Sequence, residues 1–182
     1  VWVSKEDLNI YKKHGVYAVL NAGSNAKLAS GIAPVEKMLQ MGIPLAVGTD
    51  GPSSNNALDM FREMFLVTGL GKLHDRDASA VPAEEVLKMA VTGGAKAMGL
   101  TDCDCLAESK KADLIMIDLN QPNMQPINNP MKNLVYSGSK QNVKMTMING
   151  KILYENQKFF IGVEPKEVYK KANEIITRMR QS

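Results

Sequence analysis

The sequence has few cysteines, few histidines and little excess charge. Its two cysteines, Cys103 and Cys105, are separated by one residue, which is too close for an ordinary structural disulfide and fits a reducing cytoplasm. The net charge of +3 is too small to indicate binding to nucleic acid or to a membrane. No apolar run approaches membrane-spanning length, and no signal-peptide pattern is present. We therefore expect a cytoplasmic protein that binds neither nucleic acid nor membrane.

The two histidines, His14 and His74, do not have the spacing of a metal-binding motif. His14 precedes Gly15 at the end of a predicted helix, where a cation suits the helix dipole and a surface position is expected. A zinc site normally has three protein ligands, so we do not expect these residues to complete one. A single Cys-x-Cys without a second pair favours two thiols in a loop over a soft-metal site.

The composition is that of an ordinary globular protein, with 45% hydrophobic and 23% charged residues. A length of 182 residues suffices for one domain or for somewhat more than one. Internal repeats and low-complexity tracts are absent from the sequence. The first residue is Val1, and the first predicted element is a helix with no strand before it. We therefore expect the chain to be part of a longer protein.

Helices and strands alternate in the first half of the predicted structure. Ser4 is expected to cap the first helix and Gly15 to end it. The remaining expected elements are a buried strand over 16–20, a polar loop over 21–31, a helix over 34–41, a strand over 45–47, and helices over about 58–70 and 82–98. Methionines at the apolar positions of these helices are expected to fill the core. Alternation with short connections indicates parallel strands in an α/β sheet or barrel.

The pattern changes after Leu100. A β run is predicted over 112–119, and a loop over 121–130. A hairpin is predicted over 143–154, because Asn149-Gly150 between two apolar runs is the strongest short hairpin signal. An amphipathic helix is predicted near the C-terminus. The expected domains are 1–100 as a barrel-like α/β part, 101–163 as part of a small β-rich domain, and 164–182 as a C-terminal helix.

One short segment places a single carboxylate at the end of an apolar strand. The run that starts at Leu45 stops at Asp50 and then turns through Gly51 and Pro52. Barrels of the α/β class present catalytic groups at such strand tips. Asp50 could therefore bind a metal, act as a base, do both, or cap the following helix. The polar residues after the turn could contact a substrate or cap that helix; these are Ser53, Ser54, Asn55 and Asn56, with capping favoured for Asn56.

Several segments resemble one family, the metal-dependent amidohydrolases. Residues 24–34 resemble the loop after the seventh barrel strand, and residues 48–51 with 54–56 resemble the tip of the eighth. Residues 111–115 and 149–151 resemble the small, urease-like composite domain that these enzymes carry beside the barrel. The most similar subgroup contains S-adenosylhomocysteine/methylthioadenosine deaminases, guanine deaminases and atrazine chlorohydrolases.

The resemblance implies the C-terminal portion of a (β/α)₈ TIM-type barrel, with its last two strands and helices, part of a small β-rich domain and a C-terminal helix. It implies one divalent metal ion, of the zinc type, and a metal-bound hydroxide that hydrolytically deaminates or dechlorinates a heteroaromatic ring such as that of an adenosine derivative. Only Asp50 matches a metal ligand and proton-transfer group of the family; the family's other ligands are absent from this chain.

Ser53, Ser54 and Asn25 are the candidate substrate-binding residues, although Asn25 and Lys27 could instead shape their loop, which the resemblance favours. With one metal ligand, the isolated chain is expected to be inactive. Two barrel strands without their neighbours leave unpaired edges, so we expect self-association or a homo-oligomer.

One departure from the family leaves a second interpretation open. The family commonly has His-Asn-Pro or His-Cys-Pro at the end of its seventh strand, whereas this chain has Leu20-Asn21-Ala22. Together with the missing metal ligands, this departure is compatible with a non-catalytic structural or assembly protein derived from an amidohydrolase.

Overall fold

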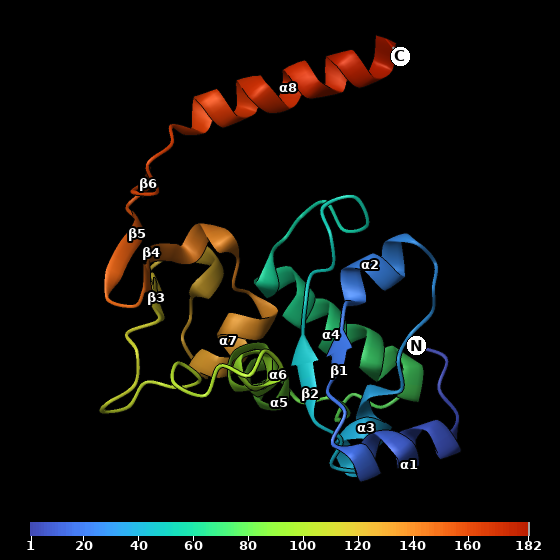
Figure 1. Cartoon of the computed structure of the whole chain (residues 1–182). Coiled ribbons are helices and arrows are strands. Elements are labelled where there is room, and N and C mark those ends of the chain that lie inside the picture. The colour runs from blue at the N-terminus through green and yellow to red at the C-terminus, as the bar shows by residue number, and fades with distance from the viewer. Residues whose placement is uncertain (182) are drawn as a thin grey trace. The chain divides into compact units, whose positions relative to one another are not determined.

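Two short parallel strands organise the first part of the chain in the computed structural model, which describes residues 1–181 (Figure 1). β1 (Ala18–Leu20) pairs in parallel with β2 (Leu45–Val47), with Ala18 opposite Leu45 and Leu20 opposite Val47. This pairing confirms the parallel arrangement predicted from the alternation of helices and strands. β2 is buried along its whole length, as predicted. The prediction of a buried strand is wrong for β1, because Val19 at its centre is 49% exposed.

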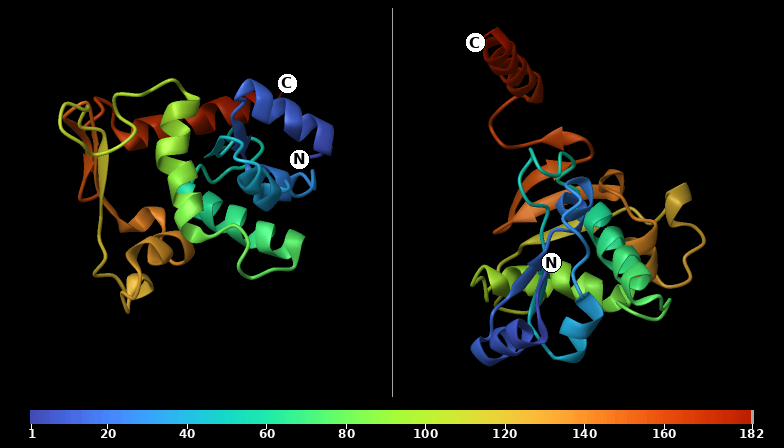
Figure 2. Two further views of the ribbon diagram at one scale, coloured as in Figure 1. Left: turned by 90° about the horizontal axis from the view of Figure 1, so that it is seen from below. Right: turned by 90° about the vertical axis from the view of Figure 1, so that its right-hand side faces the viewer.

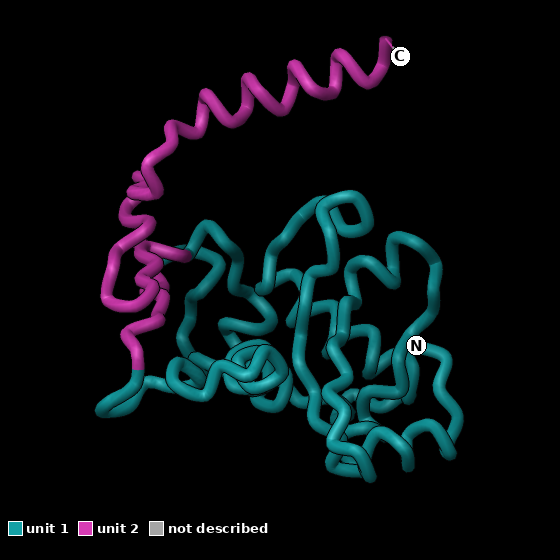
Figure 3. Tube along the Cα trace, viewed as in Figure 1, with its two compact units in different colours: residues 1–110, 119–142 teal, residues 111–118, 143–182 magenta. Residues whose placement is uncertain are grey.

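The described residues group into two units, which together make a mixed α/β protein (Figure 3). The first unit joins Val1–Lys110 to Leu119–Asn142, and the second joins Lys111–Asp118 to the chain from Val143 onward. The first unit carries the β1–β2 pair and the helices around it. Its α-helices are α1 (Lys5–His14), α2 (Ala22–Lys27), α3 (Val35–Gln40), α4 (Met60–Asp75), α5 (Ala83–Lys88), α6 (Gly94–Ala97) and α7 (Pro130–Tyr136).

The first helix begins and ends as its capping residues predict. The Asp7 backbone N–H donates to the Ser4 hydroxyl at 3.1 Å, and the Ser4 N–H donates to the Asp7 carboxylate at 2.7 Å. This reciprocal pair is a capping box, which satisfies two N–H groups that the first helical turn leaves free. Gly15 ends α1 with a φ of 61°, in the left-handed region that favours glycine.

The sequence-based predictions missed two helices. The segment 21–31, expected to be a loop, contains α2, and the stretch 121–136 contains the helical turn η2 (Pro122–Met124) and then α7. α2 lies against α4 and buries its first residues, Ala22, Gly23 and Ser24. The intrinsic preference of this polar, glycine-bearing segment is therefore overridden by tertiary packing.

The helical segments η1 (Met89–Gly93) and α6 pack closely against β2. The helix predicted over 82–98 is divided by a π-helical turn, η1 (Met89–Gly93), between α5 and α6. At Gly93, an added Cβ would lie 2.3 Å from the carbonyl oxygen of Leu45 in β2. The absence of a side chain at Gly93 thus lets the helix pack directly on the strand. Met38, Met64 and Met89 fill the core as predicted, whereas Met98 is 70% exposed, contrary to the prediction.

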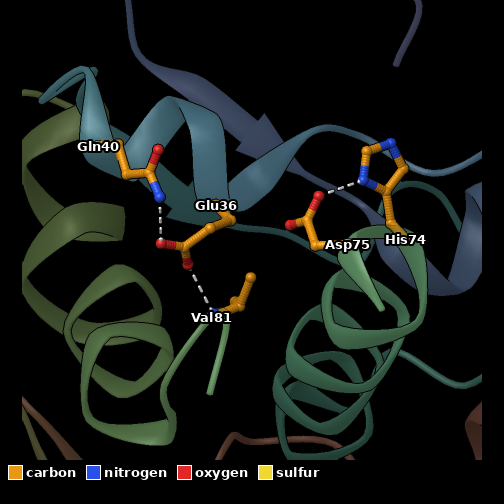
Figure 4. A network of polar contacts seen from close by, with 5 residues as sticks. All are labelled: Glu36, Gln40, His74, Asp75 and Val81. Carbon is orange, nitrogen blue, oxygen red and sulfur yellow. Dashed lines mark hydrogen bonds and ion pairs between the residues drawn. The ribbon is translucent and has the colours of Figure 1, made fainter. Parts of the chain in front are cut away.

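Hydrogen bonds at Val81 hold the turn before α5 in place. Val81 is fully buried with a φ of +46°, a conformation that β-branched residues rarely adopt. Its N–H donates to the Glu36 carboxylate at 2.8 Å, and its carbonyl accepts from the Thr68 hydroxyl at 2.6 Å. The Glu36 carboxylate also accepts from the Gln40 amide at 3.0 Å (Figure 4). Hydrogen bonds from α3 and α4 therefore fix both sides of this strained residue.

The second unit is an antiparallel sheet followed by a helix. The sheet has the order β3-β4-β5-β6, formed by β3 (Leu114–Ile117), β4 (Val143–Ile148), β5 (Lys151–Glu155) and β6 (Lys158–Phe159). The hairpin predicted at Asn149-Gly150 is confirmed, and both turn residues have positive φ, as a type I′ turn requires. α8 (Pro165–Gln181) confirms the predicted amphipathic helix. None of the helices within residues 1–181 is both long and apolar enough to cross a membrane.

Two glycines of α4 should respond in opposite ways to substitution by alanine. At Gly71 an added Cβ would lie 2.5 Å from Val81 Cγ2, so Gly71→Ala should lower the free energy of unfolding by about 1–3 kcal/mol. At Gly69 nothing lies within 4 Å of an added Cβ, so Gly69→Ala should raise it by up to about 1 kcal/mol. Chemical denaturation of both variants measures the difference; equal effects would contradict the packing described for Val81.

The free edge of β1 predicts self-association. Within residues 1–181, β1 pairs with β2 alone, and the half-exposed Val19 lies on this strand. We expect light scattering to give a mass above the 19.9 kDa of one chain. Val19→Lys should shift the mass toward that of the monomer, because charged side chains oppose strand-edge pairing.

Val91→Lys provides the control for this experiment, because Val91 is similarly exposed (54%) but lies in the helical segment η1. An equal response of both variants would show that general surface charge, and not the strand edge, governs association.

Candidate functional site

The carboxyl ends of the parallel strands β1 and β2 lie on the same side as α2, which follows β1 (Figures 1 and 2). Beyond the buried Val47, the chain passes through Gly48 and Thr49 and reaches Asp50, which is exposed. Asp50 has a φ of +58°, in the left-handed region that aspartate tolerates better than most residues. Asp50 therefore lies at the strand tip that the sequence predicted, in an uncommon backbone conformation.

Hydroxyl and amide donors surround the Asp50 carboxylate. The Ser24 hydroxyl donates to Oδ2 at 2.7 Å, and the Gly51 backbone N–H donates to Oδ1 at 2.7 Å. Hydrogen bonds from Ser24, then Ser54, then Gly51 lower the pKa of Asp50 below its ordinary value. A carboxylate has about four lone-pair sites, so each oxygen keeps capacity to bind a cation or a proton. The side chain is thus suited to serve as a metal ligand and as a base.

The residues after the turn do not cap α4 as the sequence suggested. Asp59 is the N-cap residue of α4, since its carboxylate accepts from the N–H groups of Phe61 at 3.0 Å and Arg62 at 3.4 Å. The interpretation of Asp50 as the cap of this helix is therefore wrong. The capping role expected for Asn56 is wrong as well, because its side-chain oxygen accepts from the Lys27 ammonium at 2.5 Å.

Helix α2 holds the loop that follows Asp50. The Lys27 ammonium donates to the backbone carbonyl of Ser53 at 2.8 Å, in addition to its bond with Asn56. Lys27 therefore holds the loop that follows Asp50, whereas the family resemblance favoured a role in shaping its own segment, 21–31. Ser53 is exposed, and Ser54 is half-buried with its hydroxyl donating to the Gly51 carbonyl at 3.0 Å.

The third predicted substrate-binding residue, Asn25, follows Ser24 on α2 but lines a different feature. It borders a cavity of about 330 Å³ together with residues of α1, β1 and α3, among them Tyr11, Val19 and Met38. The structure thus brings Ser54 to Asp50, keeps Ser53 on the same loop, and places Asn25 beside a separate cavity.

A buried polar cluster contacts the loop that follows Asp50. The Glu63 side chain in α4 is fully buried, and Asn55 is 3% exposed. Glu63 accepts from the Gly23 N–H at 2.8 Å and from the Asn55 amide at 2.7 Å. The Asn55 amide also donates to the Thr49 carbonyl at 2.7 Å. Because Asn55 is buried, it supports the site and does not contact a substrate at the mouth.

Sequence reasoning did not single out Ser24 or Glu63. Ser24 carries no local signal, because its partner Asp50 lies 26 residues further along the chain. Glu63 does have one: it lies one helical turn before the buried Val67, on a face that also buries Met64 and Thr68. An acidic residue on an apolar helix face indicates a buried polar contact and could have been recognised.

Within residues 1–181, no three His, Cys, Asp or Glu side chains come together as a metal-binding group. His14 is exposed at the end of α1, and His74 lies in the last turn of α4, 2.8 Å from the Asp75 carboxylate (Figure 4). Cys103 and Cys105 are not joined by a disulfide, as predicted. Structural and catalytic zinc sites normally have at least three protein ligands. Asp50 has the chemistry of one such ligand.

Comparison with known proteins places these features in a family. The family model described as "Amidohydrolase family" matches residues 1–153. The chain is 41% identical over 181 residues to a 5-methylthioadenosine/S-adenosylhomocysteine deaminase of Dictyoglomus thermophilum, covering 98% of this chain and 42% of the relative. It is 42% identical over 182 residues to a 5'-deoxyadenosine deaminase of Methanosarcina barkeri, with 98% and 42% of the two chains covered.

A solved structure supports the same assignment. An adenosine deaminase from Xanthomonas campestris, crystallised with bound zinc, matches with a TM-score of 0.92 and 31% identity over 99% of this chain and 41% of its own. The chain thus spans about two fifths of the length of the relatives it matches. The predicted resemblance is confirmed: this chain belongs to the amidohydrolase family.

Proposed function

We propose that Asp50 is a metal ligand and a proton-transferring carboxylate in a zinc-dependent amidohydrolase that deaminates the adenine ring of adenosine derivatives. The observation that carries this proposal is the state of Asp50 itself. Its carboxylate is exposed at the carboxyl end of a parallel strand, and donors from Ser24 and Gly51 favour its ionised form. An ionised carboxylate open to solvent at a strand tip meets the requirements of a metal ligand in an α/β barrel.

The substrate class is inferred from the relatives' names. Both relatives at 41–42% identity are named deaminases, of methylthioadenosine/S-adenosylhomocysteine in one case and of 5'-deoxyadenosine in the other. These compounds share an adenine ring and differ at the 5' position of the ribose. We therefore propose a small-molecule adenosine derivative as the substrate and ammonia as the leaving group. Ser53 and Ser54 remain the proposed substrate contacts beside Asp50, whereas Asn25 borders the separate cavity.

We further propose that β1 and β2 are the last two strands of a (β/α)₈ barrel. The support is their parallel pairing, the family match over 1–153 and the coverage of about two fifths of each relative. In this proposal residues 1–100 belong to the barrel, 101–163 to a small β domain and 164–182 to a C-terminal helix. The metal ligands other than Asp50 then come from barrel strands outside this chain.

Asp50 and its neighbours would contribute to the reaction in a defined way. Zinc in hydrolytic sites lowers the pKa of water to about 7 and so supplies a nucleophile at neutral pH. Asp50 would hold the cation through its carboxylate and would accept a proton. The Ser24 hydroxyl and the Gly51 N–H fix the orientation of this carboxylate from α2 and from the turn. Lys27 keeps the adjoining loop in place at the mouth of the site.

Asp50→Asn tests the proposed function in the protein as it is encoded. With zinc and 5'-methylthioadenosine, this variant should lose at least about 100-fold in kcat, because an amide neither accepts the proton nor matches a carboxylate as a ligand. The conversion of the adenine ring of this substrate to a hypoxanthine ring is followed by ultraviolet absorbance. Asp59→Asn is the control, since it makes the same change at the carboxylate that caps α4. Unchanged turnover in Asp50→Asn would refute the role of Asp50.

The 182-residue chain alone serves as a second arm of this experiment. It should show no turnover with added zinc, because it provides one ligand. Turnover by this chain would contradict the proposed division of the metal site. Absence of turnover in the protein as encoded, across the adenosine derivatives named above, would favour the non-catalytic alternative.

Ser24→Ala should raise the pKa of Asp50 toward its ordinary value, because it removes the donor that lowers this pKa most. A carboxylate with a lowered pKa stabilises the fold above its unfolded-state pKa of about 3.9, and this stabilisation disappears as the pH falls through the folded-state pKa. As the pH falls, the variant should therefore lose the stabilisation that Asp50 gives the fold at a higher pH than the parent does.

The carboxyl carbon resonance of Asp50, followed by NMR against pH, measures this shift. Ser53→Ala is the matched control, since Ser53 is not among the donors that lower the pKa of Asp50. Equal pKa values in the parent and in Ser24→Ala would contradict the hydrogen-bond geometry.

A further inference from the structure

A carboxyl group with no direct access to solvent is hydrogen-bonded to Asn55, in the loop that follows Asp50. Glu63, in the first turn of α4, is fully buried, and each of its oxygens accepts one N–H. Oε2 accepts from the Gly23 backbone at 2.8 Å, and Oε1 accepts from the Asn55 amide at 2.7 Å. Burial of such a group is unfavourable unless its hydrogen bonds are made, so the positions of these two donors are closely constrained.

The contact with Glu63 fixes which way the Asn55 amide faces. Because Oε1 accepts, Asn55 must present its NH₂ group to Glu63. The other N–H of the same nitrogen then donates to the Thr49 carbonyl at 2.7 Å, while the amide oxygen accepts from the Ala57 N–H at 3.3 Å. Asn55 is therefore held at three points, and its orientation depends on the acceptor that Glu63 provides.

The Thr49 carbonyl belongs to the peptide group that precedes Asp50. The orientation of this peptide group contributes directly to the φ angle of Asp50, which is +58°. Residues other than glycine rarely adopt such a value, and it persists where surrounding contacts enforce it. The chain of hydrogen bonds from Glu63 through Asn55 to Thr49 supplies such a contact on the strand side of Asp50.

We propose that Glu63 and Asn55 are positioning residues, which hold the backbone of Asp50 in its left-handed conformation and so direct its carboxylate toward the mouth of the site. This inference rests on the proposed function for its catalytic meaning. The geometry of Asp50, however, can be tested without any activity. Gly23 belongs to the same arrangement, because an added Cβ there would lie 2.3 Å from Glu63 Oε1.

Glu63→Gln changes this arrangement with little change in volume. Glutamine has one acceptor oxygen where glutamate has two, so its NH₂ group must face either the Gly23 N–H or the Asn55 NH₂. If it faces Asn55, the Asn55 amide must turn over, and the Thr49 carbonyl loses its donor. In that orientation, we expect the Cα and Cβ chemical shifts of Asp50 to move away from left-handed values and the Gly51 amide proton to shift.

In the active protein, the same variant should lose about 10- to 100-fold in kcat, as is typical when a residue supporting a metal ligand is changed. KM should stay within about twofold of the parent value, because Glu63 is buried and does not reach the substrate.

Glu36→Gln is the matched control. Glu36 also accepts one backbone N–H, from Val81 at 2.8 Å, and one side-chain amide, from Gln40 at 3.0 Å (Figure 4). Its substitution removes the same kind of acceptor from the same unit. We expect a loss of stability in thermal denaturation with unchanged Asp50 and Gly51 resonances. Displacement of these resonances by Glu36→Gln as well would show a general effect of destabilisation and would overturn the inference.

Two further variants keep the test decisive if Glu63→Gln does not fold. Asn55→Ala leaves the Glu63–Gly23 bond in place but removes the donor to Thr49, so it should displace the same Asp50 resonances. Glu63→Gln combined with Asn55→Asp allows a hydrogen bond between the two side chains again, but aspartate has no N–H to donate to Thr49. This double variant should leave the Asp50 shifts displaced, because an acceptor oxygen then faces the Thr49 carbonyl in place of an N–H donor.

The outcomes separate this inference from the proposed function. Unchanged Asp50 and Gly51 resonances in Glu63→Gln and Asn55→Ala, or their full recovery in the double variant, would overturn the positioning role. Full activity of Asp50→Asn, with the resonance changes in Glu63→Gln intact, would overturn the proposed function and leave the positioning of Asp50 standing.

Discussion

The buried carboxyl group of Glu63 is the contact on which the arrangement at the strand ends depends. It joins three segments that are distant in the sequence: α2 through Gly23, the loop after β2 through Asn55, and α4, which carries Glu63 itself. A buried acceptor left without donors would strongly destabilise the fold, so these segments can pack only where both donors are supplied. The packing of these segments and the hydrogen bonds to Glu63 therefore impose the same geometry on the site.

Residues other than glycine have positive φ in two different settings in this protein. Asp50, Asn56 and Leu58 all have positive φ within the loop that follows β2, next to the candidate site. Val81 is equally unusual, but it lies in the turn before α5, held by Glu36 and Thr68. Strain therefore does not identify a functional residue by itself. Asp50 differs from Val81 in being exposed, charged and placed at the end of a parallel strand, and the proposed role of Asp50 rests on these properties and not on its strain.

Family membership and catalytic competence rest on different observations. The match over residues 1–153 and the identity of about 41% to named deaminases assign the family. The described residues, however, bring together no group of three His, Cys, Asp or Glu side chains. A fold can host many activities, so the chemistry must be argued from Asp50 and its donors. The chain spans about two fifths of the length of each relative.

The sequence by itself determined the features that depend on neighbouring residues. Ser4 and Asp7 predicted the start of α1, Asn149-Gly150 predicted the hairpin, and the run ending at Asp50 predicted the strand tip. These signals are local, because caps, turns and hydrophobic periodicity act over a few residues. Only the tertiary structure decided that the polar segment after β1 forms α2, that Ser24 contacts Asp50, and that Glu63 accepts from Gly23. The partners in these contacts lie 26 and 40 residues apart, so no local pattern could determine them, and packing between distant segments did.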